Sequence, residues 1–123
     1  MTIDCKNEQY EMGGKQFPCS TSITMEFIGG KYKTVILFHL RNAALRYNEL
    51  RKFMPVVTER TLSLQLKQLE QDGLLKRTVY TTKPPLKVEY ELTDFGKTLL
   101  PMLMVIAEWG RDVAAQKASV VKV

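Results

Sequence analysis

The segment Thr58–Gly73 constrains the fold of this chain most, because its residues mark both ends of a helix. The hydroxyl of Thr58 can accept a hydrogen bond from the first free backbone amides of a helix. Gly73 can adopt the left-handed conformation that ends one. The segment therefore predicts a single helix over residues 58–72, about four turns long.

This helix is expected to have one buried and one exposed face. Leu62, Leu66 and Leu69 recur at helical spacing and predict the buried stripe. The opposite side carries Arg60, Ser63, Leu64, Lys67 and Gln71. Arg and Lys reach guanine edges and phosphates, and a short apolar group contacts a thymine methyl, so this face suits a DNA major groove. An ordinary solvated face is the alternative that the segment alone leaves open.

The flanking segments favour the DNA-binding interpretation. Arg46–Phe53 predicts a second short amphipathic helix, and a turn over residues 54–57 separates the two helices, as in a helix-turn-helix. Leu74–Tyr80 and Lys87–Leu92 read as two strands of a hairpin. Pro84-Pro85 should stiffen the hairpin loop. Helix, turn, helix and hairpin in this order predict a winged helix-turn-helix.

Two further helices are expected before this unit. Ser20–Ile28 predicts a short helix with Ser20 or Thr21 as its N-cap, and two glycines end it. Lys31–Leu40 is a nearly continuous apolar run that fits a buried strand or a helix. We expect a helix there, because the order of elements in a winged helix requires one.

The C-terminal part predicts a long apolar helix. Thr93 should cap it, and Pro101 should either kink it or begin a second segment. Its apolar residues are Phe95, Leu99, Leu100, Met102, Leu103, Ile106, Trp109 and Val113. This is more apolar surface than one small core can cover, so we expect self-association.

Length and charge bound the organisation of the chain. Its 123 residues suit one domain, which we place at residues 19–117, between a flexible N-terminal arm over 1–18 and a C-terminal tail over 118–123. The predicted fold class is α+β, mainly α, with added N- and C-terminal dimerisation helices. The net charge is +5, and residues 46–91 hold nine Lys and Arg against six Asp and Glu. A basic balance there favours a polyanionic partner.

Several function classes are not supported by the sequence. Two cysteines and one histidine, His39, give no metal-ligand spacing. No phosphate-binding glycine loop or nucleophile elbow occurs, so we expect no cofactor, no metal and no enzymatic activity. The chain has no apolar run of membrane-spanning length and no signal-peptide pattern, so we expect a cytoplasmic protein.

Five ordered motifs, together with Cys19, resemble those of a known family. The motifs are Gly29-Gly30-Lys31, Leu45–Arg51 (LRYNELR), Thr61–Leu74 (TLSLQLKQLEQDGL), Pro84–Thr93 (PPLKVEYELT) and Ala107–Gly110 (AEWG). From about Cys19 to Gly110 the chain resembles the HxlR family of bacterial and archaeal transcription regulators. Tyr32 stands where the family usually has Trp, and Ser20 stands where it usually has Pro.

The resemblance implies a homodimer on double-stranded DNA. The first and last helices of such proteins form the dimer, and two recognition helices meet successive major grooves of a pseudo-palindromic operator. The expected DNA-contacting residues are Arg46, Thr58, Arg60, Thr61, Ser63, Leu64, Lys67, Arg77, Lys83 and Lys87. The expected dimer-interface residues are Ile23, Phe27, Leu99, Leu103, Ile106, Trp109 and Val113. A winged-helix module that binds protein instead of DNA is the alternative, against which Arg60 and Lys67 argue.

Cys19 has two interpretations. Cysteine is often a small buried apolar residue. Just before a helix N-terminus, however, free amides and the positive end of the dipole would lower the pKa of its thiol. Some members of the HxlR family, which the chain resembles, sense oxidants, electrophiles or other small molecules, often through the cysteine that Cys19 matches. In that interpretation Cys5 is a resolving thiol and the inducer acts on the dimer.

Overall fold

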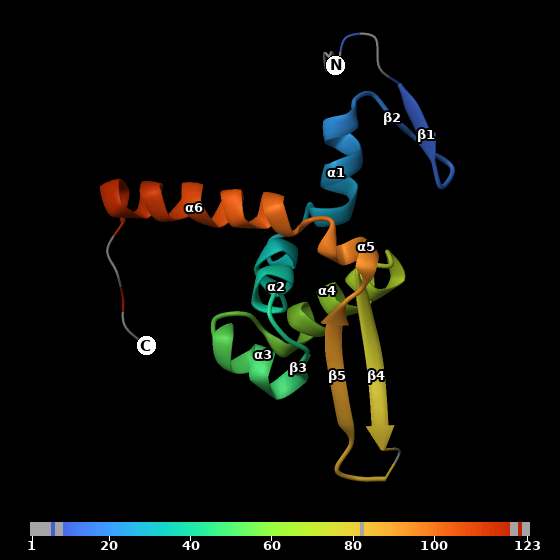
Figure 1. Ribbon diagram of the computed structural model, residues 1–123, viewed down its shortest axis with the longest axis vertical. Coiled ribbons are helices and arrows are strands. Elements are labelled where there is room, and N and C mark those ends of the chain that lie inside the picture. The colour runs from blue at the N-terminus through green and yellow to red at the C-terminus, as the bar shows by residue number, and fades with distance from the viewer. Residues whose placement is uncertain (1–5, 7–8, 82, 119–120, 122–123) are drawn as a thin grey trace.

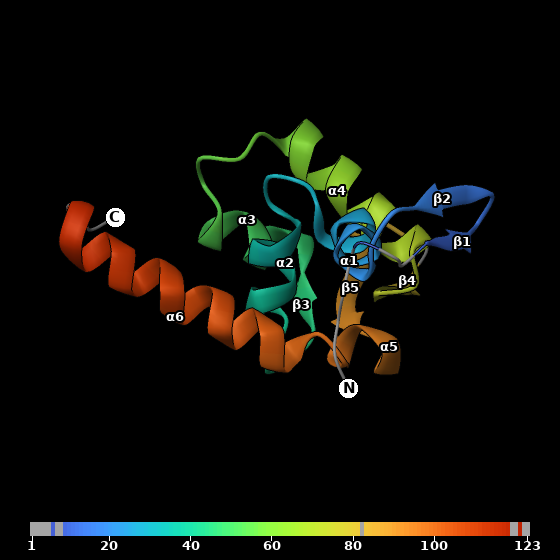
Figure 2. The same ribbon diagram turned by 90° about the horizontal axis from the view of Figure 1, so that it is seen from above.

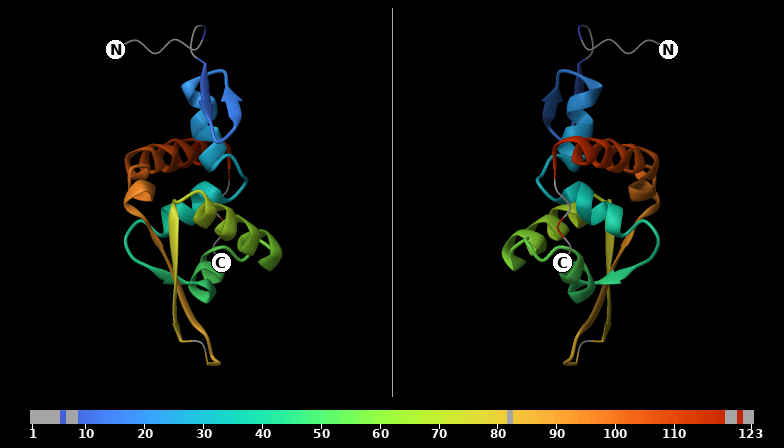
Figure 3. Two further views of the ribbon diagram at one scale, coloured as in Figure 1. Left: turned by 90° about the vertical axis from the view of Figure 1, so that its right-hand side faces the viewer. Right: turned by 90° about the vertical axis from the view of Figure 1, so that its left-hand side faces the viewer.

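The computed structural model describes residue 6, residues 9–81, residues 83–118 and residue 121. Helices α2, α3 and α4 and a three-stranded sheet form the body (Figure 1). Helix α1 and a short N-terminal hairpin rise from one end of this body, and the β4–β5 hairpin projects from the other (Figure 3). The elements are β1 (Tyr10–Met12), β2 (Lys15–Phe17), α1 (Ser20–Ile28), α2 (Lys33–His39), β3 (Leu45–Arg46), α3 (Tyr47–Phe53), α4 (Glu59–Gln71), β4 (Leu75–Thr81), β5 (Lys87–Leu92), α5 (Asp94–Lys97) and α6 (Leu100–Lys117).

The winged helix-turn-helix is confirmed, with one strand more than the sequence suggested. Helices α3 and α4 are the two helices of the motif, and β4 and β5 are the wing. The two-residue strand β3 also pairs with β5, which gives the antiparallel order β3-β5-β4. Two residues are too few for a periodic pattern, so β3 left no signal in the sequence.

Helix α4 begins and ends as its sequence predicts. The Thr58 hydroxyl accepts a hydrogen bond from the Thr61 amide at 3.2 Å. At the other end Gly73 has φ 79°, and the amides of Gly73 and Leu74 donate to the carbonyls of Glu70 and Leu69. These two bonds are the Schellman arrangement, which satisfies carbonyl groups that the helix leaves free.

The core forms where α1, α2, α3, α4 and α6 meet the sheet. The stripe of Leu62, Leu66 and Leu69 is at most 1% exposed and lies in one cluster with Ile36 of α2 and Leu50 of α3. Full burial of a leucine side chain contributes about 1.5–3 kcal/mol relative to exposure, so this stripe is a main source of stability.

Helix α2 resolves the ambiguous apolar run in favour of a helix. It packs against α3, α4 and α6, so it needs apolar residues on several sides. Ile36 and Leu37 are fully buried, and Phe38 packs against the cluster. A helix surrounded in this way has no simple amphipathic period, which explains why periodicity could not distinguish it from a strand.

Pro101 begins a second helical segment, the latter of the two predicted outcomes. It lies in the first turn of α6, where the missing proline amide costs no helical hydrogen bond. The short helix α5 precedes it, and Thr93 caps α5 by accepting a hydrogen bond from the Gly96 amide at 2.9 Å. Beyond its first turns, α6 extends past the body (Figure 2).

The N-terminal part differs from the expected arm without regular structure. Strands β1 and β2 form an antiparallel hairpin, in which Met12 pairs with Lys15 across Gly13 and Gly14. Both glycines have positive φ, 57° and 78°, which a two-residue hairpin turn requires. Phe17 is buried where β2 meets α1. Strands of three residues are too short for alternation to be recognised in the sequence.

The N-cap of α1 is Cys19, and the expectation of Ser20 or Thr21 was wrong. The Ser22 hydroxyl donates to the Cys19 carbonyl at 2.6 Å and lies 3.4 Å from the Cys19 amide. A serine three residues into the helix therefore supplies the polar contacts that an N-cap side chain normally supplies. Because cysteine is a poor N-cap, the usual start signal was absent at this position.

Two glycines allow a matched test of the packing between α4 and α5. A Cβ on Gly96 would lie 2.2 Å from the Leu74 carbonyl oxygen, whereas a Cβ on Gly110 in α6 would meet nothing within 4 Å. We expect Gly96→Ala to lower the free energy of unfolding by about 1–3 kcal/mol through overpacking. Gly110→Ala should raise it by up to about 1 kcal/mol through helix propensity. Urea denaturation of both variants measures this, and equal stabilities would contradict the close contact.

Candidate nucleic-acid interface

The exposed face of α4 carries four of the ten predicted DNA-contacting side chains. Arg60, Ser63 and Lys67 are exposed along it. Leu64 lies among them with 54% of its surface exposed. Cationic groups beside an apolar group match the acceptors and the thymine methyl of a major groove. The charges among Arg60, Ser63, Leu64 and Lys67 are positive, whereas a protein-binding module would be expected to have an acidic or neutral face here.

Thr58 and Thr61 form hydrogen bonds with each other that cap the start of α4. The Thr58 hydroxyl donates to the Thr61 hydroxyl at 3.0 Å and accepts from the Thr61 amide. The Thr61 hydroxyl still has its own proton to donate. A phosphate at this end of α4 could accept a hydrogen bond from the Thr61 hydroxyl without disturbing the cap.

Tyr47 is a residue of this surface that the sequence did not single out. Its hydroxyl lies 3.4 Å from the Glu59 carbonyl oxygen and 3.4 Å from the Ser63 hydroxyl. It therefore connects the first residue of α3 to the exposed face of α4. An aromatic residue at the start of an amphipathic helix reads as a core residue, so the sequence gave no signal for this role.

A second set of contacts fixes α4 against its neighbours. The Arg51 guanidinium of α3 donates to the carbonyl of Val57, in the turn before α4. The Tyr32 amide donates to the Gln65 side-chain oxygen of α4 at 3.1 Å. Tyr32 and Gln65 are 33 positions apart, and the Arg51 bond depends on how the turn between α3 and α4 folds, so neither bond was predictable from local pattern.

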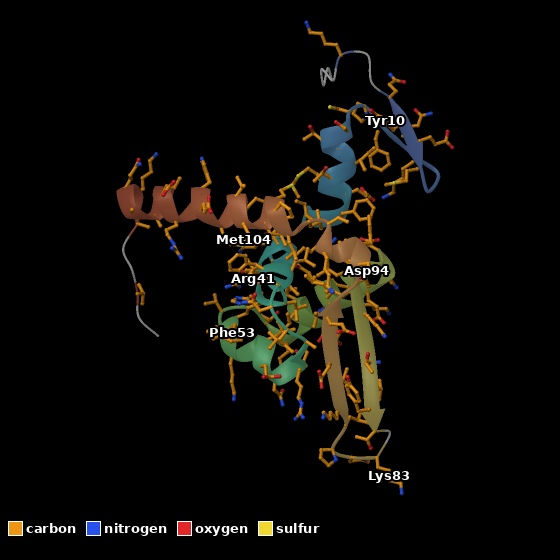
Figure 4. The ribbon with its side chains drawn as sticks, in the orientation of Figure 1. Tyr10, Arg41, Phe53, Lys83, Asp94 and Met104 are labelled. Atoms are coloured by element: carbon orange, nitrogen blue, oxygen red, sulfur yellow. The ribbon has the colours of Figure 1, made fainter. Side chains whose placement is uncertain are left out.

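The wing carries predicted DNA-contacting cations at its tip, in β4 and at the start of β5. Lys83 lies at its tip, far from α1 and α6 (Figure 4). The Thr81 hydroxyl accepts from the Lys83 amide at 3.2 Å and so closes the base of the loop. Arg77 is exposed in the middle of β4, and Lys87 begins β5. Cations spaced along a projecting hairpin, with Arg77 and Lys83 exposed and Lys87 half-buried, suit contact with phosphates.

The ten predicted DNA-contacting residues thus fall into groups. Thr58, Thr61 and the exposed side chains of α4 form one surface. Arg46 and Lys87 line one groove between the start of α3 and the wing, although they are 41 positions apart. Arg77 and Lys83 do not line that groove.

A different surface, formed by α1 and α6, holds most of the predicted dimer-interface residues. Ile106 and Trp109 are 41% and 71% exposed. Met104 and Val105, which are not among the predicted interface residues, are 43% and 63% exposed. The half-buried members of the predicted set are Ile23, Phe27, Leu99 and Val113. This α1–α6 surface lies away from the wing tip (Figure 4).

Leu103 does not belong to that surface. It is 2% exposed and packs within the core cluster of its own chain, so it has no surface left for a partner. The sequence places it on the apolar stripe of α6 but cannot show that α2 covers this position. Its assignment to the dimer interface is therefore corrected.

Cys19 lies at the junction between the N-terminal hairpin and α1. It is 9% exposed and disulfide-bonded in the structure. Cys5 lies outside the described residues. An oxidised sulfur at the N-cap of α1 is compatible with the sensing interpretation, and the burial of Cys19 also fits the packing interpretation.

His39 packs as a structural residue of α2. Its ring stacks on Phe53 with centroids 4.9 Å apart and an interplanar angle of 12°. Burial, followed by the nearby charge of Arg41, lowers the pKa of His39. Among the described residues no cluster of His, Cys, Asp and Glu could hold a metal ion. In the same part of the chain, no helix is long and apolar enough to cross a membrane.

Comparison with known proteins identifies close relatives. The chain is 48% identical over 108 residues to the HTH-type transcriptional regulator YdeP of Bacillus subtilis (strain 168), covering 88% of this chain and 79% of YdeP. The redox regulator HypR in its oxidised form has a similar structure, with a TM-score of 0.72, 44% identity, and coverage of 76% of this chain and 96% of HypR. Reduced YodB from B. subtilis gives a TM-score of 0.63 at 25% identity, covering 85% of this chain and 98% of YodB.

The family assignment rests on most of the chain. The HxlR-like helix-turn-helix family matches residues 27–118, which include α2, the helix-turn-helix, the wing and α6. The resemblance seen in the sequence motifs is thereby confirmed, and the family is one of regulators and not of enzymes. The chain belongs to the HxlR-like family of helix-turn-helix transcriptional regulators, and DNA is the partner that such a helix-turn-helix implies.

Proposed function

We propose that the protein regulates transcription as a homodimer that inserts two copies of α4 into successive major grooves of a pseudo-palindromic operator. Residues 19–117 are the unit that does this. The observation that carries the proposal is the placement of two unlike surfaces: the cationic face of α4 and the wing at one end, and the apolar α1–α6 surface away from them. Half-sites about 34 Å apart need two rigidly held recognition helices, which a helical dimer interface supplies.

Within this dimer, α4 and the wing take different roles. Arg60, Leu64 and Lys67 are exposed on α4 and would meet base edges and neighbouring phosphates. Lys83, at the tip of the wing, would meet the backbone or the minor groove. Phosphate contacts contribute similarly on every sequence, whereas base contacts distinguish sequences.

Cys19 would make the regulator responsive to oxidants. It caps α1, which contributes to the proposed dimer interface, so a change at its sulfur acts on that interface. Two thiols, Cys19 and a resolving Cys5, would lose two electrons and two protons to an oxidant such as diamide and form one disulfide. Of the similar structures, HypR is a redox regulator and YodB is also known in a diamide-treated form.

If α4 recognises bases, removing a cation from α4 and removing one from the wing should affect DNA binding differently. We expect Arg60→Ala to weaken operator binding by about 1–3 kcal/mol and to reduce the preference over random DNA. Lys83→Ala should weaken both sequences similarly. Fluorescence anisotropy on the DNA upstream of the protein's own gene and on random DNA of equal length measures both. Wild-type affinity in both variants would remove α4 and the wing tip from the interface.

The proposed dimer predicts that a charge on α6 separates the subunits. Trp109→Asp is suitable because Trp109 is 71% exposed and its loss should leave the protomer folded. We expect dissociation at micromolar concentration and a parallel loss of operator affinity, because one half-site binds far less tightly than two linked ones. Gln116→Asp, which adds the same charge to an exposed polar position of α6, is the control. Analytical ultracentrifugation that finds a wild-type monomer would refute the dimer.

The redox proposal predicts that oxidation changes operator affinity. Wild-type protein reduced with dithiothreitol and then treated with diamide should change its affinity by about fivefold or more, a coupling of ordinary allosteric size. Cys19→Ser and Cys5→Ser should not respond. An unchanged affinity in oxidised wild type leaves Cys19 as a packing residue. A response retained in Cys19→Ser places the switch elsewhere.

A further inference from the structure

A small pocket lies where the loop after α2 meets the end of β5 and helix α5. Its volume is about 260 Å³, just below the roughly 300–1,000 Å³ of clefts that hold drug-sized ligands. In Figures 2 and 3, α5 lies across the body from the exposed start of α4. The lining residues, none of which is a predicted DNA-contacting or dimer-interface residue, are Leu40, Arg41, Asn42, Ala43, Ala44, Glu91, Leu92 and Lys97. The pocket therefore belongs to neither of the two surfaces described above.

Three charged side chains line this pocket without forming an ion pair. Arg41 and Lys97 are cationic, and Glu91 is anionic. Among the described residues the salt bridge formed is that of Lys15 with Glu26, so none of these three is engaged in one. Lys76 is the cross-strand partner of Glu91 on β4, and no salt bridge joins these two described residues. Charged groups of both signs thus remain available to a ligand.

Arg41 is held in place by contacts with α2. Its guanidinium donates a hydrogen bond to the Phe38 carbonyl at 2.9 Å, and its central carbon lies 3.9 Å from the centre of the Phe38 ring. A guanidinium carries five N–H donors, so most of them remain free. Because the group is already oriented, it loses little side-chain entropy when it binds a carboxylate.

The loop over residues 42–44 adds backbone donors to the same end of the pocket. Within the part of the chain that the structure describes, the amides of these three residues donate no backbone hydrogen bond. Consecutive free amides beside a cation form a favourable site for an anion. The loop and Arg41 together therefore favour a carboxylate.

The remaining lining residues restrict the size and the second charge of the ligand. The Glu91 carboxylate is an acceptor for an ammonium group. Leu40 and Leu92 are 3% and 6% exposed and give the pocket an apolar floor, to which Ala43 and Ala44 add only methyl groups. A small molecule that carries a carboxylate, an ammonium group and a short apolar side chain matches these features.

We infer that this pocket binds a small zwitterionic amino acid, with its carboxylate at Arg41 and Lys97 and its ammonium at Glu91, and that this ligand is an effector of DNA binding. The effector role rests on the proposed function. Lys97 belongs to α5, whose N-cap Thr93 donates to the Gly73 carbonyl at the end of α4 at 2.6 Å. A ligand that connects α5 to the loop after α2 therefore acts at the junction between α4 and α6.

The test of ligand chemistry uses L-alanine and two analogues that each lack one charge, propionate and ethylamine. Each is titrated without DNA into the isotope-labelled full chain, and NMR follows the backbone amides. L-Alanine should shift the amide signals of residues 42–44 and Lys97. Each analogue should bind at least about tenfold more weakly, because one charged contact is lost. No shift of these amides with L-alanine, or equal binding of propionate, would overturn the proposal.

Glu91→Gln and Lys97→Ala test the two ends of the site. Both residues are exposed, so both variants should fold. Each should weaken L-alanine binding by about tenfold, and Glu91→Gln should also remove the preference for L-alanine over propionate. Lys117→Ala removes an equal charge from the exposed end of α6 and should bind L-alanine as wild type does. Wild-type affinity in both pocket variants would overturn the site.

Operator binding tests the effector role and separates this inference from the proposed function. Saturating L-alanine should change the affinity for the DNA upstream of the protein's own gene by about fivefold or more. The change should require about tenfold more L-alanine in Lys97→Ala. An unchanged affinity would overturn the effector role. If the protein binds this DNA but not L-alanine, the inference alone is refuted. If it binds L-alanine but no DNA, the proposed function and the effector role are refuted and the amino-acid site stands.

Discussion

Burial of one leucine stripe on α4 is the constraint on which the rest of the structure depends. Leu62, Leu66 and Leu69 must all leave water, and they do so in one core cluster with residues of α2, α3, β4 and α6. Because the side chains of a helix have fixed angular positions, burying this stripe fixes the direction of the opposite face. Arg60 and Lys67 are therefore presented to solvent as a consequence of packing, and the energy that orients them comes from the core.

The sequence predicts elements whose signals are local and strong. Helix α4 combines a cap, a period of leucines and a terminal glycine, so both its bounds and its buried face were predictable. The hairpin around Gly13, the strand β3 and the cap by Cys19 were missed. In these cases the elements are short or the stabilising group, such as the Ser22 hydroxyl, acts from an unexpected position.

The candidate site was predictable in composition but not in arrangement. Helical periodicity placed Arg60 on an outer face, yet no local pattern could bring Arg46 beside Lys87 or the Tyr47 hydroxyl beside Ser63. Such neighbours depend on β3 pairing with β5 and on the angle between α3 and α4. The assignment of Leu103 to the dimer interface was wrong for the same reason. The sequence shows that a residue is apolar, but it does not show which element covers it.

The bonds at the end of α4 show how a change in the dimer could reach DNA. The Thr93 hydroxyl donates to the Gly73 carbonyl at 2.6 Å and accepts from the Gly96 amide, so one side chain joins the end of α4 to the start of α5. The two backbones are closely packed there, because a Cβ on Gly96 would meet the Leu74 carbonyl oxygen. Because α6 follows α5 almost directly, this junction would couple a movement of the α1–α6 surface to α4. In the proposed dimer, a shift between the two α6 helices would therefore change the separation of the two α4 helices. Because successive major grooves have a fixed spacing, such a change would weaken binding to DNA.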